Sequence, residues 1–137
     1  MKFRTTLLAL LVSSTLAGAS LAAEQPVATS DSPEAEASLY NQSVTLPRQA
    51  AVCAERIADY MPRFQKFYDA WRTENAARIA NGDRFLHEQA SKGGVNADEG
   101  TARLAEQDVE RLRKTSLELL ARHCQLIIDS LAPPPAN

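Results

Sequence analysis

The chain has 137 residues, of which 45% are hydrophobic and 23% charged, with 15 basic and 17 acidic side chains and a net charge of −2. This composition is typical of one globular domain. An acidic chain is poorly suited to a nucleic-acid partner, and no apolar run reaches the roughly 18 to 20 residues of a membrane span. The sequence has no glycine-rich phosphate loop and no zinc or haem cysteine pattern, so we predict no cofactor and no metal site.

The first 22 residues have the three parts of a secretory signal peptide. A short basic stretch precedes an apolar run over residues 7–16, and small residues follow at positions 19–23. We expect cleavage after Ala22, with Ala19 as the alternative site, and no lipid anchor because this region contains no cysteine. The mature protein, with 13 basic and 17 acidic residues, is predicted to be periplasmic or secreted.

Composition divides the remaining chain into three parts. Residues 23–44 are rich in Ser, Thr, Pro, Glu and Ala and contain four acidic but no basic residues, which predicts a disordered acidic leader. Residues 45–132 are predicted to form a helical hairpin domain. Residues 133–137 begin with three consecutive prolines and are predicted to be a proline-rich tail, because proline cannot continue a helix.

The domain is predicted to be all-α, because its apolar residues recur at spacings of three and four. The first helix is expected to begin at Thr45 to Pro47, where threonine can cap the helix and proline suits its first turn. We expect it to be kinked or restarted near Pro62. The sequence Asn81-Gly82 then predicts its end, because glycine readily adopts a left-handed conformation.

After this break we expect a short helix over 84–91, a loop over 92–97 and a long helix over 98–131. The predicted architecture is an antiparallel hairpin of two long helices, with the short helix folded over its tip. The residues of the last helix predicted to point inward are Leu104, Val109, Leu112, Leu119, Leu120, His123, Cys124, Ile127 and Leu131.

The two cysteines, Cys53 and Cys124, are predicted to form a disulfide, because exported chains with an even number of cysteines usually oxidise them. One lies near the start of the first long helix and the other near the end of the last. In an antiparallel hairpin these two positions are level with each other. The disulfide would therefore clamp the open end of the hairpin.

Five aromatic residues fall within twelve positions and leave two interpretations open. They are either a core cluster, or partly an exposed patch that binds another protein or pairs with a second copy to form a four-helix bundle. Arg63 and Lys66 lie beside them and would accommodate an acidic or aromatic partner. The candidate partner-binding residues are Tyr60, Arg63, Phe64, Lys66, Phe67, Tyr68 and Trp71.

Candidate catalytic groups are few. His123 lies on the apolar stripe beside Cys124, where we expect a core histidine that is bonded to a backbone group or a carboxylate. His87 is expected on the surface near the tip, about 40 Å from the disulfide end. With both cysteines oxidised and no nucleophile motif present, we predict that the chain is not an enzyme.

The sequence therefore favours a non-catalytic, exported interaction protein, such as a periplasmic adaptor, a chaperone-like binder, or an inhibitor or immunity protein. Its partner would be another protein or a second copy of the chain. The alternative is a protein that binds a small ligand between its helices. That ligand would lie near Phe64, Tyr68, Trp71 and Leu112.

Overall fold

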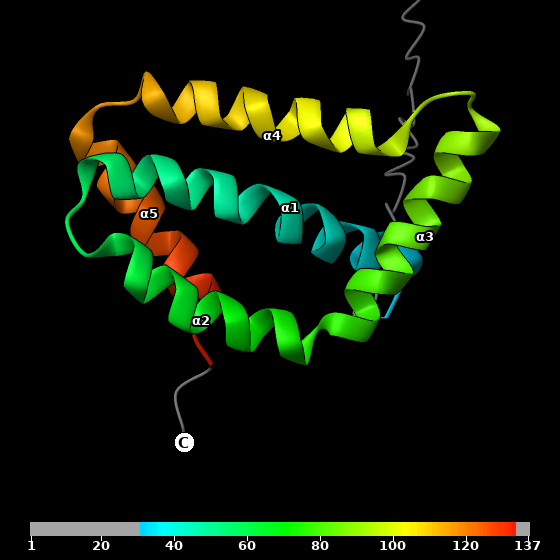
Figure 1. Cartoon of the computed structure of the whole chain (residues 1–137), viewed down its shortest axis with the longest axis horizontal. Helices are drawn as coiled ribbons and strands as arrows, with labels where there is room; N and C mark the ends of the chain where they lie inside the picture. The colour runs from blue at the N-terminus through cyan, green and yellow to red at the C-terminus, as the bar shows by residue number, and fades with distance from the viewer. Residues whose placement is uncertain (1–30, 134–137) are drawn as a thin grey trace, which may run out of the picture.

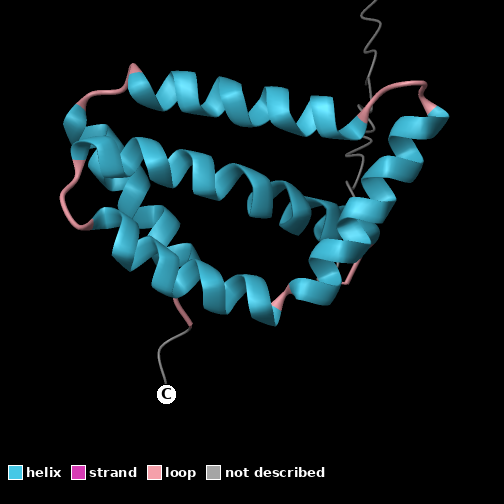
Figure 2. Ribbon diagram, viewed as in Figure 1, coloured by secondary structure: helices cyan, strands magenta, loops and turns pink. Residues whose placement is uncertain are grey.

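The computed structural model describes residues 31–133, and this part of the chain is helical without any strand (Figure 2). The predicted all-α class is therefore confirmed. The predicted signal peptide lies outside the described residues, as does the proline-rich tail beyond Pro133. The five helices are α1 (Pro33–Arg56), α2 (Tyr60–Glu74), α3 (Ala76–Lys92), α4 (Ala97–Arg113) and α5 (Leu117–Leu131).

Helix α1 lies at the centre of the arrangement and contacts each of the other four helices. In Figure 1, α4 runs along one side of α1 and α2 lies on the other side, while α3 crosses the beginning of α1 and leads from the end of α2 to the start of α4. Helix α5 lies near the end at which α1 finishes (Figure 1). None of the helices between residues 31 and 133 is both long and apolar enough to cross a membrane.

Helix α1 begins at Pro33, not at Thr45 as predicted. Ser32 caps the helix by accepting a hydrogen bond from the backbone N–H of Ala35 at 3.2 Å, and Pro33 occupies the first turn. Residues 33–44, predicted as part of a disordered leader, thus form the first half of α1. Ala37 in this half is buried, so tertiary packing offsets the polar composition.

Pro47 lies inside α1, and a side chain of α2 supplies the hydrogen bond that the proline cannot donate. Proline has no N–H, so the carbonyl oxygen of Ser43, four residues earlier, lacks its usual helical donor. The phenolic O–H of Tyr68 donates a hydrogen bond to this oxygen at 2.6 Å. The structure therefore pairs an interior proline with a buried tyrosine.

We expect Tyr68→Phe to lower the free energy of unfolding by about 1–2 kcal/mol, because it leaves the Ser43 carbonyl without a donor. In a Pro47→Ala background, the restored N–H of residue 47 can bond this carbonyl. In that background, Tyr68→Phe should lower the free energy of unfolding by no more than about 0.5 kcal/mol. Urea unfolding of the four chains in this double-mutant cycle measures the coupling energy between Tyr68 and Pro47. An equal loss of stability from Tyr68→Phe in both backgrounds would contradict the predicted coupling.

The first long helix predicted from the sequence is divided into three. The chain turns before α2 at Asp59, which has a φ of 56°, and Pro62 lies in the first turn of α2, where proline is tolerated. A second break occurs at Asn75, whose side chain donates to the Trp71 carbonyl at 2.8 Å. The predicted end at Asn81 is wrong, because α3 continues through it to Lys92.

Gly82 does not end a helix but allows two helices to touch. It is buried in the middle of α3, where its backbone lies directly against α1. A Cβ atom at this position would overlap the carbonyl group of Glu36 and lie 2.8 Å from the backbone nitrogen of Ala37. Glycine is therefore required here by the close approach of α1 and α3.

The predicted long helix over 98–131 is also divided, into α4 and α5. Ser116 caps α5 by accepting a hydrogen bond from the N–H of Leu119 at 3.4 Å. The division changes which side chains face inward. Leu104 and Leu119, both predicted to be inside, are each 56% exposed, whereas their neighbours Ala105 and Leu120 are fully buried.

The predicted disulfide between Cys53 and Cys124 is confirmed. It joins the last turns of α1 to the middle of α5, with the two Cα atoms 5.9 Å apart, and both cysteines are buried. The core surrounds this bond. Its buried members are Ala50, Val52, Cys53, Tyr60, Phe64, Tyr68, Val109, Leu112, Leu120, Cys124, Ile127, Ile128 and Leu131.

Candidate functional site

The aromatic residues of α2 lie mainly in the core. Tyr60 and Phe64 are each 2% exposed and Tyr68 is 8% exposed. Their rings stack in sequence, with centroids 6.4 Å and 5.0 Å apart. These three rings are therefore not available to a partner at the surface, in agreement with the core interpretation of the cluster.

The other two aromatic residues, Phe67 and Trp71, are partly buried and pack against the same core. The Trp71 ring lies 5.8 Å from that of Tyr68. Lys66 lies over the Phe67 ring, with its amine 5.8 Å from the ring centroid, and Arg63 reaches α5, where it donates to Gln125 at 3.4 Å. The side chains predicted to bind a partner thus contact one another and α5.

Tyr60 links α2 to the disulfide region. Its hydroxyl donates a hydrogen bond to the carbonyl oxygen of Cys124 at 3.0 Å. Burial raises the pKa of Tyr60 to about 12, although the nearby Arg63 acts in the opposite direction. The phenol therefore remains a hydrogen-bond donor across the physiological range of pH, and its role is structural.

Two of the exposed apolar side chains of α5 lie together on a different surface. Leu119 is 56% exposed and Leu126 is 66% exposed. With His123 between them, they follow the i, i+4, i+7 spacing of one helical stripe. We call these three residues, Leu119, His123 and Leu126, the α5 face.

The sequence analysis did not identify the α5 face, because it predicted one continuous helix and assigned both Leu119 and Leu120 to the core. In the structure, the buried side of α5 is formed by residues that repeat from Leu120 onward. The cap at Ser116 was a local signal in the sequence that a new helix begins here. A helix that begins there, with Leu120, Cys124, Ile127 and Leu131 on its buried side, places Leu119 outside that side.

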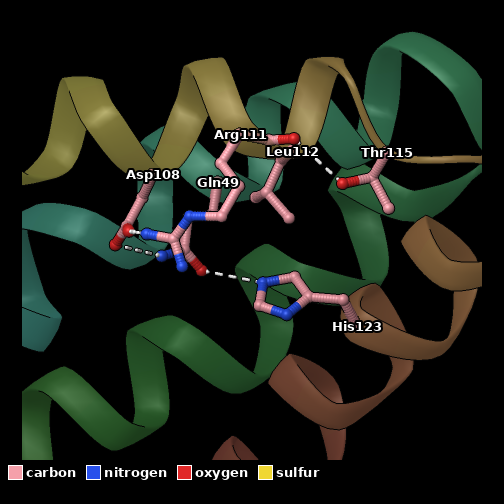
Figure 3. Close-up of a pocket in the computed structure, with 6 residues that line it drawn as sticks. All are labelled: Gln49, Asp108, Arg111, Leu112, Thr115 and His123. Atoms are coloured by element: carbon pink, nitrogen blue, oxygen red, sulfur yellow. Dashed lines mark hydrogen bonds and ion pairs between the residues drawn. The ribbon is translucent and has the colours of Figure 1, made fainter.

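A cleft of about 270 Å³ opens beside the α5 face, between α1, α4 and α5. Figure 3 shows that its side chains come from all three helices and from the turn after α4. Leu112 supplies apolar surface and His123 connects the cleft to the α5 face. The lining residues are Gln49, Asp108, Arg111, Leu112, Thr115 and His123.

Hydrogen bonds join the polar residues of the cleft into a chain (Figure 3). The Nε2 atom of Gln49 donates to the Asp108 carboxylate at 3.1 Å. The Oε1 atom of Gln49 is then the acceptor that faces Nε2 of His123, also at 3.1 Å, so Nε2 carries the proton of the neutral ring. Arg111 forms an ion pair with the same carboxylate.

Burial lowers the pKa of His123, as does the charge of Arg111, whereas Asp108 opposes them. The imidazole is therefore neutral at pH 7 and held in one orientation by Gln49. The sequence predicted a backbone or carboxylate partner for His123, and the structure instead supplies a side-chain amide. This arrangement positions the ring at the edge of the cleft.

His87, the other histidine, lies on α3 near the start of α4 and is exposed, as predicted. Its Nε2 atom is 3.2 Å from the carboxylate of Asp83 and 3.3 Å from that of Asp98. Tyr40 of α1 also reaches Asp98, at 3.5 Å. Within residues 31–133, no group of three or more His, Cys, Asp or Glu side chains has an arrangement that could hold a metal ion.

The chain has no match among the protein-family models, the curated proteins or the solved structures with which it was compared.

Proposed function

We propose that this chain is an exported, non-catalytic protein that binds a helix of a protein partner, and that the α5 face with the adjoining cleft is its binding surface. The observation that carries the proposal is the exposure of Leu119 and Leu126 on one stripe of one helix. Their separation of seven residues, about two helical turns or 10.5 Å, matches the spacing at which an amphipathic helix presents its own apolar side chains.

The surroundings of the leucines support the same proposal. The cleft at His123 and Leu112 offers space beside the leucines for an apolar side chain of a partner. Charged residues border the surface, with Glu118 and Arg122 paired on the outer side of α5 and Arg111 beside the cleft. An apolar centre with a polar rim is the usual anatomy of a protein interface.

Export is a separate part of the proposal. It is supported by the signal-peptide pattern in residues 1–22 and by the disulfide between Cys53 and Cys124. Disulfides form and persist mainly in oxidising compartments. The partner would accordingly be a protein of the periplasm or the medium.

Photo-crosslinking from the α5 face in the native host tests the proposal. We expect Leu126→p-benzoylphenylalanine to form a discrete adduct larger than the chain. Adding Leu119→Asp should reduce its yield at least about tenfold, because a charge in an apolar contact is strongly unfavourable. The same photoreactive residue at Leu104 should form no such adduct.

Leu104 is the matched control, because its side chain is as exposed as that of Leu119, at 56%, but lies on α4 away from the cleft. Leu104→Asp and Leu119→Asp should therefore alter the melting temperature to the same small extent. Adducts of similar yield from positions 104 and 126, or an adduct that survives Leu119→Asp, would contradict the proposed surface.

A further inference from the structure

We propose that a groove in the corner between α3 and α4 binds a small uncharged molecule that has an apolar body and a carbonyl-type hydrogen-bond acceptor. The groove has a volume of about 370 Å³ and lies where α3 leads into the start of α4 (Figure 1). It shares no residue with the α5 face or with the cleft beside that face. The inference therefore does not depend on the proposed function.

The walls of the groove are mainly apolar. Leu86 of α3, Val95 of the following loop and Leu104 of α4 line it. Val95 is 67% exposed and Leu104 is 56% exposed, and within residues 31–133 these are the large apolar side chains outside α5 that are exposed. Both lie at this one site. Mostly apolar pockets of roughly 300–1,000 Å³ between helices are typical sites for small molecules.

Gly100 keeps the groove open on the side of α4. The residue lines the groove, and a Cβ atom added to it would have no neighbour within 4 Å. Glycine is unfavourable inside a helix, and no close approach of another helix requires it here, in contrast to Gly82. The space beside Gly100 is therefore available to a ligand.

Two side-chain amides supply hydrogen-bond donors to the groove. The Oδ1 atom of Asn41 accepts from the Thr101 hydroxyl at 3.3 Å. The Oδ1 atom of Asn96 accepts from two backbone N–H groups at the start of α4, at 2.9 Å and 3.2 Å. Because both oxygens are used within the fold, the amide nitrogen is the atom that each side chain can offer to a ligand. An acceptor such as a carbonyl oxygen matches these nitrogens.

The charge of the groove favours an uncharged ligand. None of the residues between 31 and 133 that line it carries a charge, so an ionised group would lose its hydration without gaining a countercharge. The first turn of α4 carries two acidic residues, Asp98 and Glu99, which further disfavour an anion. The donors and the neutral lining together define the ligand class.

A fluorescence titration with the uncharged naphthalene ketone prodan tests the inference. Prodan has an apolar ring system and one carbonyl group, and its emission moves to shorter wavelength in an apolar environment. We expect this shift as the oxidised protein is added, with a Kd on the order of 100 µM. The anion anilinonaphthalene sulfonate should bind at least about tenfold more weakly. Equal or tighter binding of the anion would overturn the ligand class.

Two substitutions should remove the site without unfolding the chain. Gly100→Leu fills the groove with a residue that favours the helix, and Leu104→Asp places a charge in its apolar wall. Each should weaken prodan binding at least about tenfold while the helical content stays the same. Leu119→Asp is the matched control, because Leu119 is equally exposed at 56% but lies outside the groove, and it should leave the Kd unchanged.

Asn96→Asp tests the hydrogen bond to the carbonyl. Aspartate keeps the acceptor that caps α4 but lacks the amide N–H groups, so we expect prodan to bind about fivefold more weakly. An unchanged Kd would contradict the donor role of Asn96.

The site itself would be refuted by an emission that does not move at about 1 mM protein. It would also be refuted if Gly100→Leu bound prodan as well as the original chain does, or if Leu119→Asp weakened binding as much as Leu104→Asp. A small molecule in the groove gives no protein adduct, so position 104 remains a control for the α5 face. The two proposals can therefore fail separately.

Discussion

Gly82→Ala is expected to lower the free energy of unfolding by about 3 kcal/mol or more, although it adds only one methyl group. The added Cβ would overlap the backbone of Glu36 and approach that of Ala37. Both obstructing groups belong to the backbone of a helix and not to flexible side chains, so α1 and α3 would have to move apart. Denaturant unfolding followed by circular dichroism measures the loss.

Gly100→Ala is the control for this prediction. Gly100 lies inside α4, and a Cβ atom there would have no neighbour within 4 Å. Alanine at this position should increase stability by about 0.5–1 kcal/mol, because it favours the helix over the unfolded chain. Similar effects of the two substitutions would show that α1 and α3 do not touch at Gly82.

Loss of the disulfide is expected to have a comparable effect. The bond closes a loop between residues 71 positions apart, for which the chain-entropy model gives about 4 kcal/mol of stabilisation. This is a large part of the 5–15 kcal/mol typical of a small domain. The double variant Cys53→Ala/Cys124→Ala should therefore unfold at a much lower urea concentration than the oxidised protein.

Reduction provides an independent measure of the same contribution. In excess dithiothreitol, the original chain should unfold at nearly the same urea concentration as the double alanine variant. After reoxidation it should again unfold at the higher urea concentration of the oxidised protein. Mass spectrometry of the purified protein should find no free thiol. Two free thiols, or a stability that reduction leaves unchanged, would contradict the role assigned to the bond.

The features that could be predicted from the sequence were those set by composition and periodicity. Apolar spacings of three and four identified an all-α chain, and the even cysteine count, read together with the predicted export signal, identified the bond between Cys53 and Cys124. Neither prediction depended on the exact ends of the helices. Both predictions therefore hold although the described chain has five helices where two long helices and one short helix were predicted.

Helix boundaries were missed where tertiary contacts decide them. Gly82 has the local character of a helix end, but its role is to let α1 approach α3. Pro47 was read as a helix start, whereas Tyr68 supplies the hydrogen bond that makes it tolerable in the interior. In both cases the deciding group is distant in sequence, so local propensity could not reveal it.

The surface that we propose for binding lies on a different helix from the one that the sequence indicated. The cluster of aromatic residues indicated α2, but Tyr60, Phe64 and Tyr68 lie in the core. The hydroxyl groups of Tyr60 and Tyr68 donate hydrogen bonds to α5 and α1. The break before α5 set the phase of that helix and turned Leu119 outward. The cap at Ser116 was a local signal of this break.

The photo-crosslinking adduct formed from position 126 of α5 tests the central claim most directly. The account predicts one discrete adduct larger than the chain, whose yield Leu119→Asp reduces at least about tenfold. It also predicts no adduct when the photoreactive group is placed at Leu104. Absence of any adduct from position 126, or equal adducts from both positions, would contradict the claim that the α5 face is a binding surface.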